Sequence, residues 1–255
     1  MNVLKRLDRF YKKYKGEKGV IGYSELGEKI PYFKVYKTNY PIIVAQYCIH
    51  AREYITAELC LKTIKYQVKN GKIGTIYFLP CTNPDGVKIC LNGNRLYKAN
   101  ANMVDLNVNF DARWAMGDKN VKTPSSENYI GKFPFSEKES RALRDFTLKV
   151  KPDSTLSFHS KGEVIYYGFD GSNNIKRDKN IAKRLSKVNG YQVERSVGSV
   201  GGYKDWCVEK LDIPSFTIEV GSDSLSHPIK RKYLGKIYKR NKNLINALTE
   251  ILCVK

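Results

Sequence analysis

Short apolar runs alternate with segments of helical periodicity along most of this chain. PIIVAQYCIH and TIYFLP are expected to form buried strands, and further strands are expected in STLSFHS, VIYYGF and PSFTIEV. The segments expected to form helices are residues 52–69, 136–151, 176–189 and the C-terminal tail. Apolar strands that alternate with helices are typical of α/β domains with a parallel or mixed sheet. The pattern therefore predicts one α/β domain over residues 1–255.

Local signals place further elements between these segments. Residues 1–18 are expected to form an amphipathic helix packed on the domain, with an apolar side made of Val3, Leu4, Leu7, Phe10, Tyr11 and Tyr14. GYSELGEKIPYFKVY resembles a turn and a strand, and NPDG after Pro80 is expected to form a turn. Ser136 with Glu139 three positions later predicts a capping box. The tail is expected to form one long helix.

Composition narrows the classes of protein further. Hydrophobic residues make up 42% of the chain, enough for a packed core. The sequence contains no apolar run of 18 residues and no apolar leader. We therefore expect no membrane span and, by default, a cytoplasmic location. Action at the cell wall or in a sporulating cell stays open. The six cysteines have no CxxC spacing, which favours buried thiols over disulfides.

The formal charge of +20 favours encounter with polyanions such as nucleic acid, anionic lipid or an acidic wall polymer. The lysines are scattered, however, and no arginine-rich block with interleaved aromatics is present. The densest basic run, KRKYLGKIYKRNK, fits the solvated face of a helix. We therefore expect no dedicated nucleic-acid site.

Four polar residues lie at or near the ends of predicted strands: His50, Asn83, His159 and Glu219. Ligands of open α/β sheets gather at the carboxyl ends of the strands. This convergence, more than any one of the four residues, indicates a functional site.

The stretch HAREYIT begins the first long helical pattern with His50 and Glu53. Positions i and i+3 of a helix share a face, so both side chains could reach one ion. The pair alone is weak, because HxxE spacings are common by chance. Zinc in catalytic sites usually takes three protein ligands, so a third is needed. His159 and His227 are both candidates, although His227 precedes Pro228, where a capping or surface role is favoured.

Glu219 lies among apolar residues in PSFTIEVG. A carboxylate in such a strand is costly to bury without a role. It could act as a base that takes a proton from an activated water and returns it to a leaving amine. The plainer alternative is a structural salt bridge.

Taken in order, HAREYIT, NPDG, DLN, the strand ending at His159 and FTIEVG resemble the zinc carboxypeptidases, the carboxypeptidase A-like metallopeptidases. The resemblance extends from about residue 20 to residue 250. It implies a single α/β domain with a mixed, mainly eight-stranded sheet flanked by helices. It also implies one zinc ion held by His50, Glu53 and His159, with Glu219 as general base.

Several positions depart from the pattern of this family. An arginine that grips the substrate's terminal carboxylate follows the Asn of DLN in carboxypeptidases, whereas Val108 follows Asn107 here. The family's tyrosine falls at Val208. Its carbonyl-polarising arginine falls at Lys98, which offers a point charge that could still stabilise an oxyanion. Arg52 matches a position that contacts substrate.

The departures, with YKANANMVDLN and GYKDWCVEKLDIPSFTIEVG, resemble the bacterial branch of γ-D-glutamyl-meso-diaminopimelate peptidases. Cleavage of peptidoglycan stem peptide at that bond is therefore the leading interpretation, with an anionic peptide as substrate. The substrate contacts are expected from Asn107 and from basic residues, namely Arg52, Lys98, Arg95 and Lys204.

Two other functions stay open. One is a metallocarboxypeptidase, or a deglutamylating relative, in which another basic residue replaces the clamp arginine near Asn107. The other is a non-catalytic wall- or nucleic-acid-binding protein, against which the complete ligand set argues. A His/Glu/His set also accepts cobalt or nickel, so the sequence does not fix the metal used in the cell.

Overall fold

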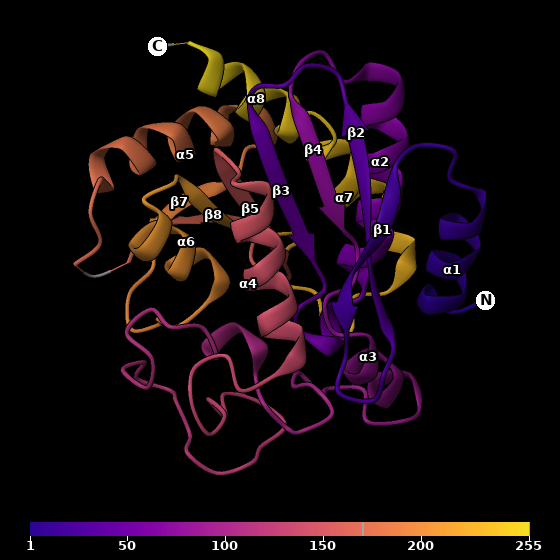
Figure 1. The fold of residues 1–255 in the computed structure, drawn as a ribbon, viewed down its shortest axis with the longest axis vertical. Coiled ribbons are helices and arrows are strands. Elements are labelled where there is room, and N and C mark those ends of the chain that lie inside the picture. Colours follow the sequence, from indigo (N-terminus) through magenta and orange to yellow (C-terminus); the bar gives the residue numbers. More distant parts are fainter. Residues whose placement is uncertain (170, 255) are drawn as a thin grey trace.

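An eight-stranded mixed sheet organises the chain in the computed structural model, which describes residues 1–169 and 171–254 (Figure 1). The spatial order of the strands is β1-β2-β4-β3-β5-β8-β6-β7. Their bounds are β1 Lys18–Tyr23, β2 Lys29–Tyr36, β3 Ile42–Tyr47, β4 Thr75–Leu79, β5 Ser154–His159, β6 Val164–Tyr167, β7 Gln192–Arg195 and β8 Ser215–Glu219. The predicted fold class is thereby confirmed.

The central strands β4, β3, β5 and β8 are mutually parallel, while β2 and β6 pair antiparallel to them on either side. From β3 the chain first moves outward to β4 and later returns to β5 on the other side of β3. The strand order therefore reverses between β3 and β5. Such a switch point leaves a crevice at the carboxyl ends of the two strands.

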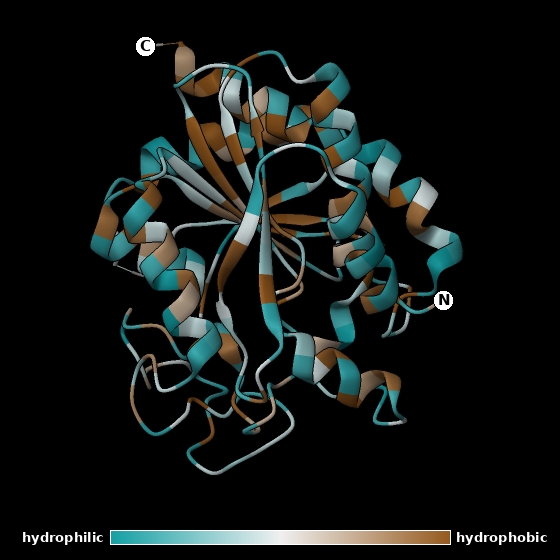
Figure 2. Ribbon diagram, turned by 45° about the vertical axis from the view of Figure 1, so that its right-hand side comes forward, coloured by the Kyte–Doolittle hydropathy of each residue, from teal (hydrophilic) through white to brown (hydrophobic). Residues whose placement is uncertain are grey.

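Helices cover both faces of the sheet (Figures 1 and 2). One core cluster joins the sheet to α1, α2, α5, α7 and α8, and a second joins its other face to α4 and α6. The helices are α1 Val3–Lys13, α2 Ile55–Asn70, α3 Pro84–Leu91, α4 Lys138–Val150, α5 Ile175–Asn189, α6 Tyr203–Leu211, α7 Leu234–Asn241 and α8 Leu244–Cys253.

Strand β3 shows how the apolar runs are buried on both sides. Its residues Ile43, Ala45 and Tyr47 join the first core, whereas Val44 joins the second. Successive side chains of a strand point to opposite faces, so a continuous apolar run suits a strand covered on both sides. The Tyr47 ring stacks on Phe158 of neighbouring β5 with centroids 4.3 Å apart. These contacts hold the two central strands in register.

Three local predictions were wrong. NPDG begins α3 instead of forming a turn, because the Asn83 side chain accepts a hydrogen bond from the Gly86 amide and Pro84 suits the first turn of a helix. Ser136 does not cap a helix, because its hydroxyl donates to the Glu137 side chain. The C-terminal tail is interrupted between α7 and α8 rather than forming one helix.

Other expectations agree with the structure. Residues 3–13 form α1, which packs Val3 and Leu7 into the first core. All six cysteines are free and five are buried, whereas Cys253 is exposed. Within the described part of the chain, none of the helices combines the length and apolar character needed to cross a bilayer.

Candidate metal centre and active site

The three strands beside the switch point carry the predicted site residues at their carboxyl ends. His159 is the last residue of β5, Glu219 is the last residue of β8, and the two are directly paired in the sheet. His50 follows the end of β3 and precedes a short 3-10 turn, Ala51–Glu53, which carries Glu53. Parallel pairing therefore brings together residues that lie more than one hundred positions apart in the sequence.

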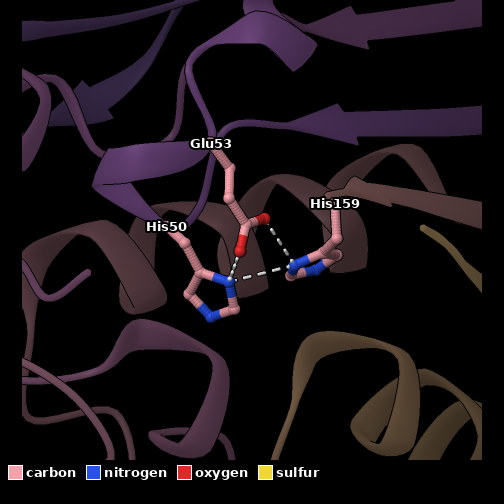
Figure 3. Close-up of side chains that lie close together, drawn as sticks. All are labelled: His50, Glu53 and His159. Carbon is pink, nitrogen blue, oxygen red and sulfur yellow. Dashed lines mark hydrogen bonds and ion pairs between the residues drawn. The ribbon is translucent and has the colours of Figure 1, made fainter. Parts of the chain in front are cut away.

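His50, Glu53 and His159 converge on one point (Figure 3). Nδ1 of His50 lies 2.9 Å from Glu53 Oε1, and Nδ1 of His159 lies 3.2 Å from Glu53 Oε2. The two Nδ1 atoms are 3.1 Å apart. All three side chains are buried, and their ligand atoms lie within 4.8 Å of one another.

The other ring nitrogen of each histidine is occupied outside the cluster. Nε2 of His50 lies 3.1 Å from Asp105 Oδ1, and Nε2 of His159 lies 3.1 Å from the Ser157 hydroxyl. Attraction to the Lys98 ammonium and to His50 outweighs burial and holds the pKa of Asp105 well below its usual range. Asp105 is therefore an acceptor, and His50 must donate to it.

A similar chain fixes the ring of His159. The Gln46 amide nitrogen donates to the Tyr47 carbonyl oxygen and to Thr82, so the amide oxygen of Gln46 accepts at 2.6 Å from the Ser157 hydroxyl. Ser157 has one hydroxyl hydrogen, already used in that bond, so it must accept from Nε2–H of His159. In its neutral form each histidine ring thus presents an unprotonated Nδ1 to the cluster.

This donor set fits a metal ion. Two lone pairs facing each other at 3.1 Å repel unless a cation lies between them or beside them. Two imidazole nitrogens and one carboxylate are a common protein ligand set for catalytic zinc, and the outer hydrogen bonds to Asp105 and Ser157 resemble those that orient metal-bound histidines. Although burial opposes ionisation, the nearby histidines hold the pKa of Glu53 well below its usual range.

Glu219 stands beside this cluster with an unused oxygen. Its Oε2 is buried and accepts no hydrogen bond from any described residue. Burial, reinforced by the Glu53 carboxylate and opposed by His159, raises the pKa of Glu219 to about 8. An acidic group that titrates near neutral pH within a cleft suits proton transfer. The structural salt bridge considered from sequence is absent among the described ion pairs.

Two cavities, of about 270 and 290 Å³, open on the cluster of His50, Glu53 and His159. Both cavities are lined by His50, Lys98 and Asn107. The smaller also contains Asp105 and Val108, and the larger contains His159 and Glu219. The structure thus brings Lys98 and Asn107 to the site. Lys98 Nζ pairs with Asp105 Oδ2 at 2.7 Å, and this attraction overcomes burial to raise the pKa of Lys98.

Arg52 and Arg95 lie outside the linings described for these two cavities. Arg52 pairs with Glu127 at 3.1 Å and donates to the Leu96 carbonyl oxygen, while Arg95 is exposed. Their substrate roles stay predictions. His227 is half-buried and is not part of the described metal-binding group, which contains His159 instead.

Sequence reasoning gave no role to Asp105, Ser157 or Gln46. Ser157 lies two positions before His159 in the same strand, so the side chains share a face. That spacing was a usable signal. Asp105 belongs to the DLN motif, yet its approach to His50 depends on a loop whose path the sequence does not specify. Asn83 acts nearby by donating to the carbonyl oxygens of Ile49 and Ala99.

The sheet, its switch point and the His/Glu/His cluster with an adjacent carboxylate define a metallopeptidase-type site on an α/β domain. The chain belongs to the zinc carboxypeptidase family, whose model, described as "Zinc carboxypeptidase", matches residues 5–243. This confirms the resemblance found in the sequence and places the chain among zinc metallopeptidases.

Individual relatives agree with this assignment. The chain is 30% identical over 275 residues to Gamma-D-glutamyl-L-diamino acid endopeptidase 1 of Lysinibacillus sphaericus, an alignment that covers 90% of this chain and 66% of that protein. The chain therefore spans slightly less than two thirds of the relative's length.

Solved structures confirm the fold. Bovine thrombin-activatable fibrinolysis inhibitor, in complex with tick carboxypeptidase inhibitor, superposes with a TM-score of 0.87 at 22% identity and covers 98% of this chain and 95% of its own. Murein-tripeptide amidase MpaA of Escherichia coli O157 gives a TM-score of 0.66 at 22% identity, over 94% of this chain and 92% of its own.

Proposed function

We propose that this chain hydrolyses peptidoglycan stem peptide at the γ-D-glutamyl–meso-diaminopimelate bond. The observation that carries this proposal is the 30% identity, over 90% of the chain, to a γ-D-glutamyl-L-diamino acid endopeptidase. Val108 at the position of the carboxylate-gripping arginine also supports it. Val108 is a buried aliphatic residue in the cavity wall, and it cannot pair with a terminal carboxylate.

In this proposal His50, Glu53 and His159 hold the zinc ion, His50 and His159 through Nδ1. Bound zinc supplies Lewis acidity, which makes water acidic enough to lose a proton near neutral pH. Asp105 and Ser157 keep the two imidazole rings in the tautomer that leaves Nδ1 free. Because the cluster is buried, bulk water is excluded and the electrostatic interactions between these charges are stronger than in water.

Glu219 is the general base. It takes one proton from the attacking water while the water oxygen forms a bond to the scissile carbonyl carbon. When the carbon–nitrogen bond breaks, Glu219 returns that proton to the leaving amine, so the products are an amine and a carboxylic acid, which then releases its remaining proton to solvent. Lys98 provides the positive charge that stabilises the negative carbonyl oxygen, because Lys98 lines both cavities beside the cluster.

A metallocarboxypeptidase that releases C-terminal residues is the second candidate. It is favoured by one observation: two lysines, Lys98 and Lys204, line the same cavity as Asn107. Either could grip a terminal carboxylate in place of the missing arginine. Substrates for the two activities differ in the bond that is cut.

The tetrapeptide L-Ala-γ-D-Glu-meso-diaminopimelate-D-Ala distinguishes the two functions. We expect zinc-loaded protein to yield L-Ala-γ-D-Glu and diaminopimelyl-D-Ala, identified by mass spectrometry. Release of D-Ala alone, or cleavage of only an ordinary peptide at its C-terminal residue, would favour the carboxypeptidase. Chelated protein and the Glu219→Gln variant are the controls, and both should be inactive.

A further inference from the structure

Lys204 and Asp205 form a buried ion pair in the wall of the larger cavity. They occupy the first turn of α6 and are 5% and 4% exposed. The same cavity, of about 290 Å³, is lined by His159 and Glu219 of the candidate active site. A substrate group that enters this cavity from the His50/Glu53/His159 cluster therefore meets this ion pair in addition to Lys98 and Glu219.

The contacts of this pair leave bonding capacity for a ligand. The Lys204 ammonium donates to the Gly168 carbonyl oxygen at 2.5 Å and to Asp205 Oδ1. Its third N–H has no hydrogen-bond acceptor among the described residues. Asp205 Oδ2 accepts from the Gly202 amide at 3.0 Å, and each carboxylate oxygen has a further lone pair.

The requirements of the helix do not explain the lysine. The hydrogen bond to Gly202 caps α6 and needs only Asp205. Burying the Lys204 ammonium is costly in free energy, and the Phe169 ring, whose centroid is 5.7 Å from Nζ, offsets only part of that cost. A buried cation that the helix cap does not need, placed in a cavity beside the proposed catalytic cluster, is a candidate for ligand recognition.

We propose that the Lys204–Asp205 pair binds the zwitterionic α-amino-acid group at the far end of a diamino-acid side chain. The carboxylate of that group pairs with the Lys204 ammonium, and its ammonium pairs with the Asp205 carboxylate. Four charges then alternate in sign, so each ion gains an opposite neighbour as it loses water. This inference rests on the proposed function and names the part of the substrate that the site selects.

The proposal also accounts for Val108, which stands where carboxypeptidases have the arginine that grips a terminal carboxylate. That residue lines the other cavity, so a carboxylate contact there is lost. A carboxylate on the diamino-acid side chain is instead gripped on the α6 side of the cluster. A lysine residue in the substrate has only an ammonium at its end and would leave the Lys204 charge without a new partner.

The test compares three tripeptides, L-Ala-γ-D-Glu linked to meso-diaminopimelate, to meso-diaminopimelate amidated at its D-centre, and to L-lysine. Binding is measured by calorimetry with zinc-loaded Glu219→Gln protein, so that turnover does not interfere. We expect the free diaminopimelate peptide to bind about 10- to 100-fold more tightly than the other two. Adding Lys204→Met should bring the three affinities to within about threefold. Lys210→Met, on the same helix but outside the cavity, should keep the selectivity.

Hydrolysis by protein with Glu219 intact separates this inference from the proposed function. Lys204-dependent selectivity without cleavage of the γ-D-glutamyl bond would support the subsite and overturn the function. Cleavage with selectivity that Lys204→Met leaves unchanged would overturn the subsite alone. Equal weakening of all three peptides by Lys204→Met, with a lowered melting temperature, would assign the pair a purely structural role.

Discussion

Asp105 accepts a hydrogen bond from Nε2 of His50 at 3.1 Å, and its second oxygen pairs with the Lys98 ammonium at 2.7 Å. One fully buried carboxylate therefore joins His50, a predicted metal ligand, to the cation of Lys98. The negative charge makes His50 a stronger electron donor, while Lys98 keeps that charge from being left unpaired in the interior. In the proposed mechanism, zinc binding by His50 and the positive charge of Lys98 thus depend on the same side chain.

Asp105→Asn should weaken zinc binding by about 10- to 100-fold, because the amide removes the negative charge behind His50. Competition with a chromophoric chelator measures the dissociation constant. Asp111→Asn is the matched control, since Asp111 is exposed in the same loop region. Equal affinities for the Asp105→Asn variant and the unaltered protein would show that this hydrogen bond does not tune the metal.

Ser157→Ala should also weaken zinc binding, by up to about tenfold, because Nε2–H of His159 loses its acceptor and the ring is less firmly oriented. Cobalt substitution offers a second measurement, since its visible absorption spectrum is sensitive to ligand geometry. Ser154→Ala on the same strand is the control, because Ser154 donates to the Pro214 carbonyl oxygen instead. A cobalt spectrum unchanged by Ser157→Ala would contradict the positioning role.

The fold and the core of the site were predictable because their signals are local and periodic. Apolar runs such as residues 41–50 and 75–80 predicted strands, and their polar ends predicted where a site would form. His50 and Glu53 are three residues apart, so their proximity follows from local geometry. The approach of His159 followed from the expectation that parallel strands end at one edge of the sheet.

The sequence did not predict the segments in which two local conformations are about equally favourable and distant contacts decide between them. Asn83 could begin a turn or cap a helix, and tertiary contacts to Ile49 and Ala99 favour the cap. Helix α6 was missed because its residues are buried on most sides, which removes an amphipathic pattern. Asp105 reaches His50 through a loop, and loop paths are set by distant packing.

Removal and return of zinc should identify the third ligand. Zinc at 100 times its dissociation constant stabilises the folded chain by about 2.7 kcal/mol, which for this size raises the melting temperature by roughly 5–10 °C. His159→Ala should abolish most of this response, because one Nδ1 is lost. His227→Ala should retain it, because His227 lies outside the described cluster. The reverse result would exchange the roles of the two histidines.

The stability of the metal-free protein should fall as pH rises through the range in which Glu219 titrates. Its pKa is raised by burial to about 8, above the ordinary value near 4.5. Between these values the folded chain holds a proton that the unfolded chain has released, so the free energy of unfolding decreases with increasing pH. Each unit of pKa difference corresponds to about 1.4 kcal/mol, which gives a total loss of a few kcal/mol. Urea titrations of chelated protein between pH 5 and pH 9 measure it.

Glu219→Gln should remove this part of the pH dependence, because the amide does not ionise. The variant should then be more stable than the chelated parent protein at pH 8 and nearly equal to it at pH 5. Glu127→Gln serves as the control, since that carboxylate is exposed and should leave the slope of the parent protein unchanged. Parallel stability profiles for the Glu219→Gln variant and its parent would mean that Glu219 is ionised throughout the range. Glu219 would then be a base that is already ionised near neutral pH, in contrast to the carboxyl group with a raised pKa described here.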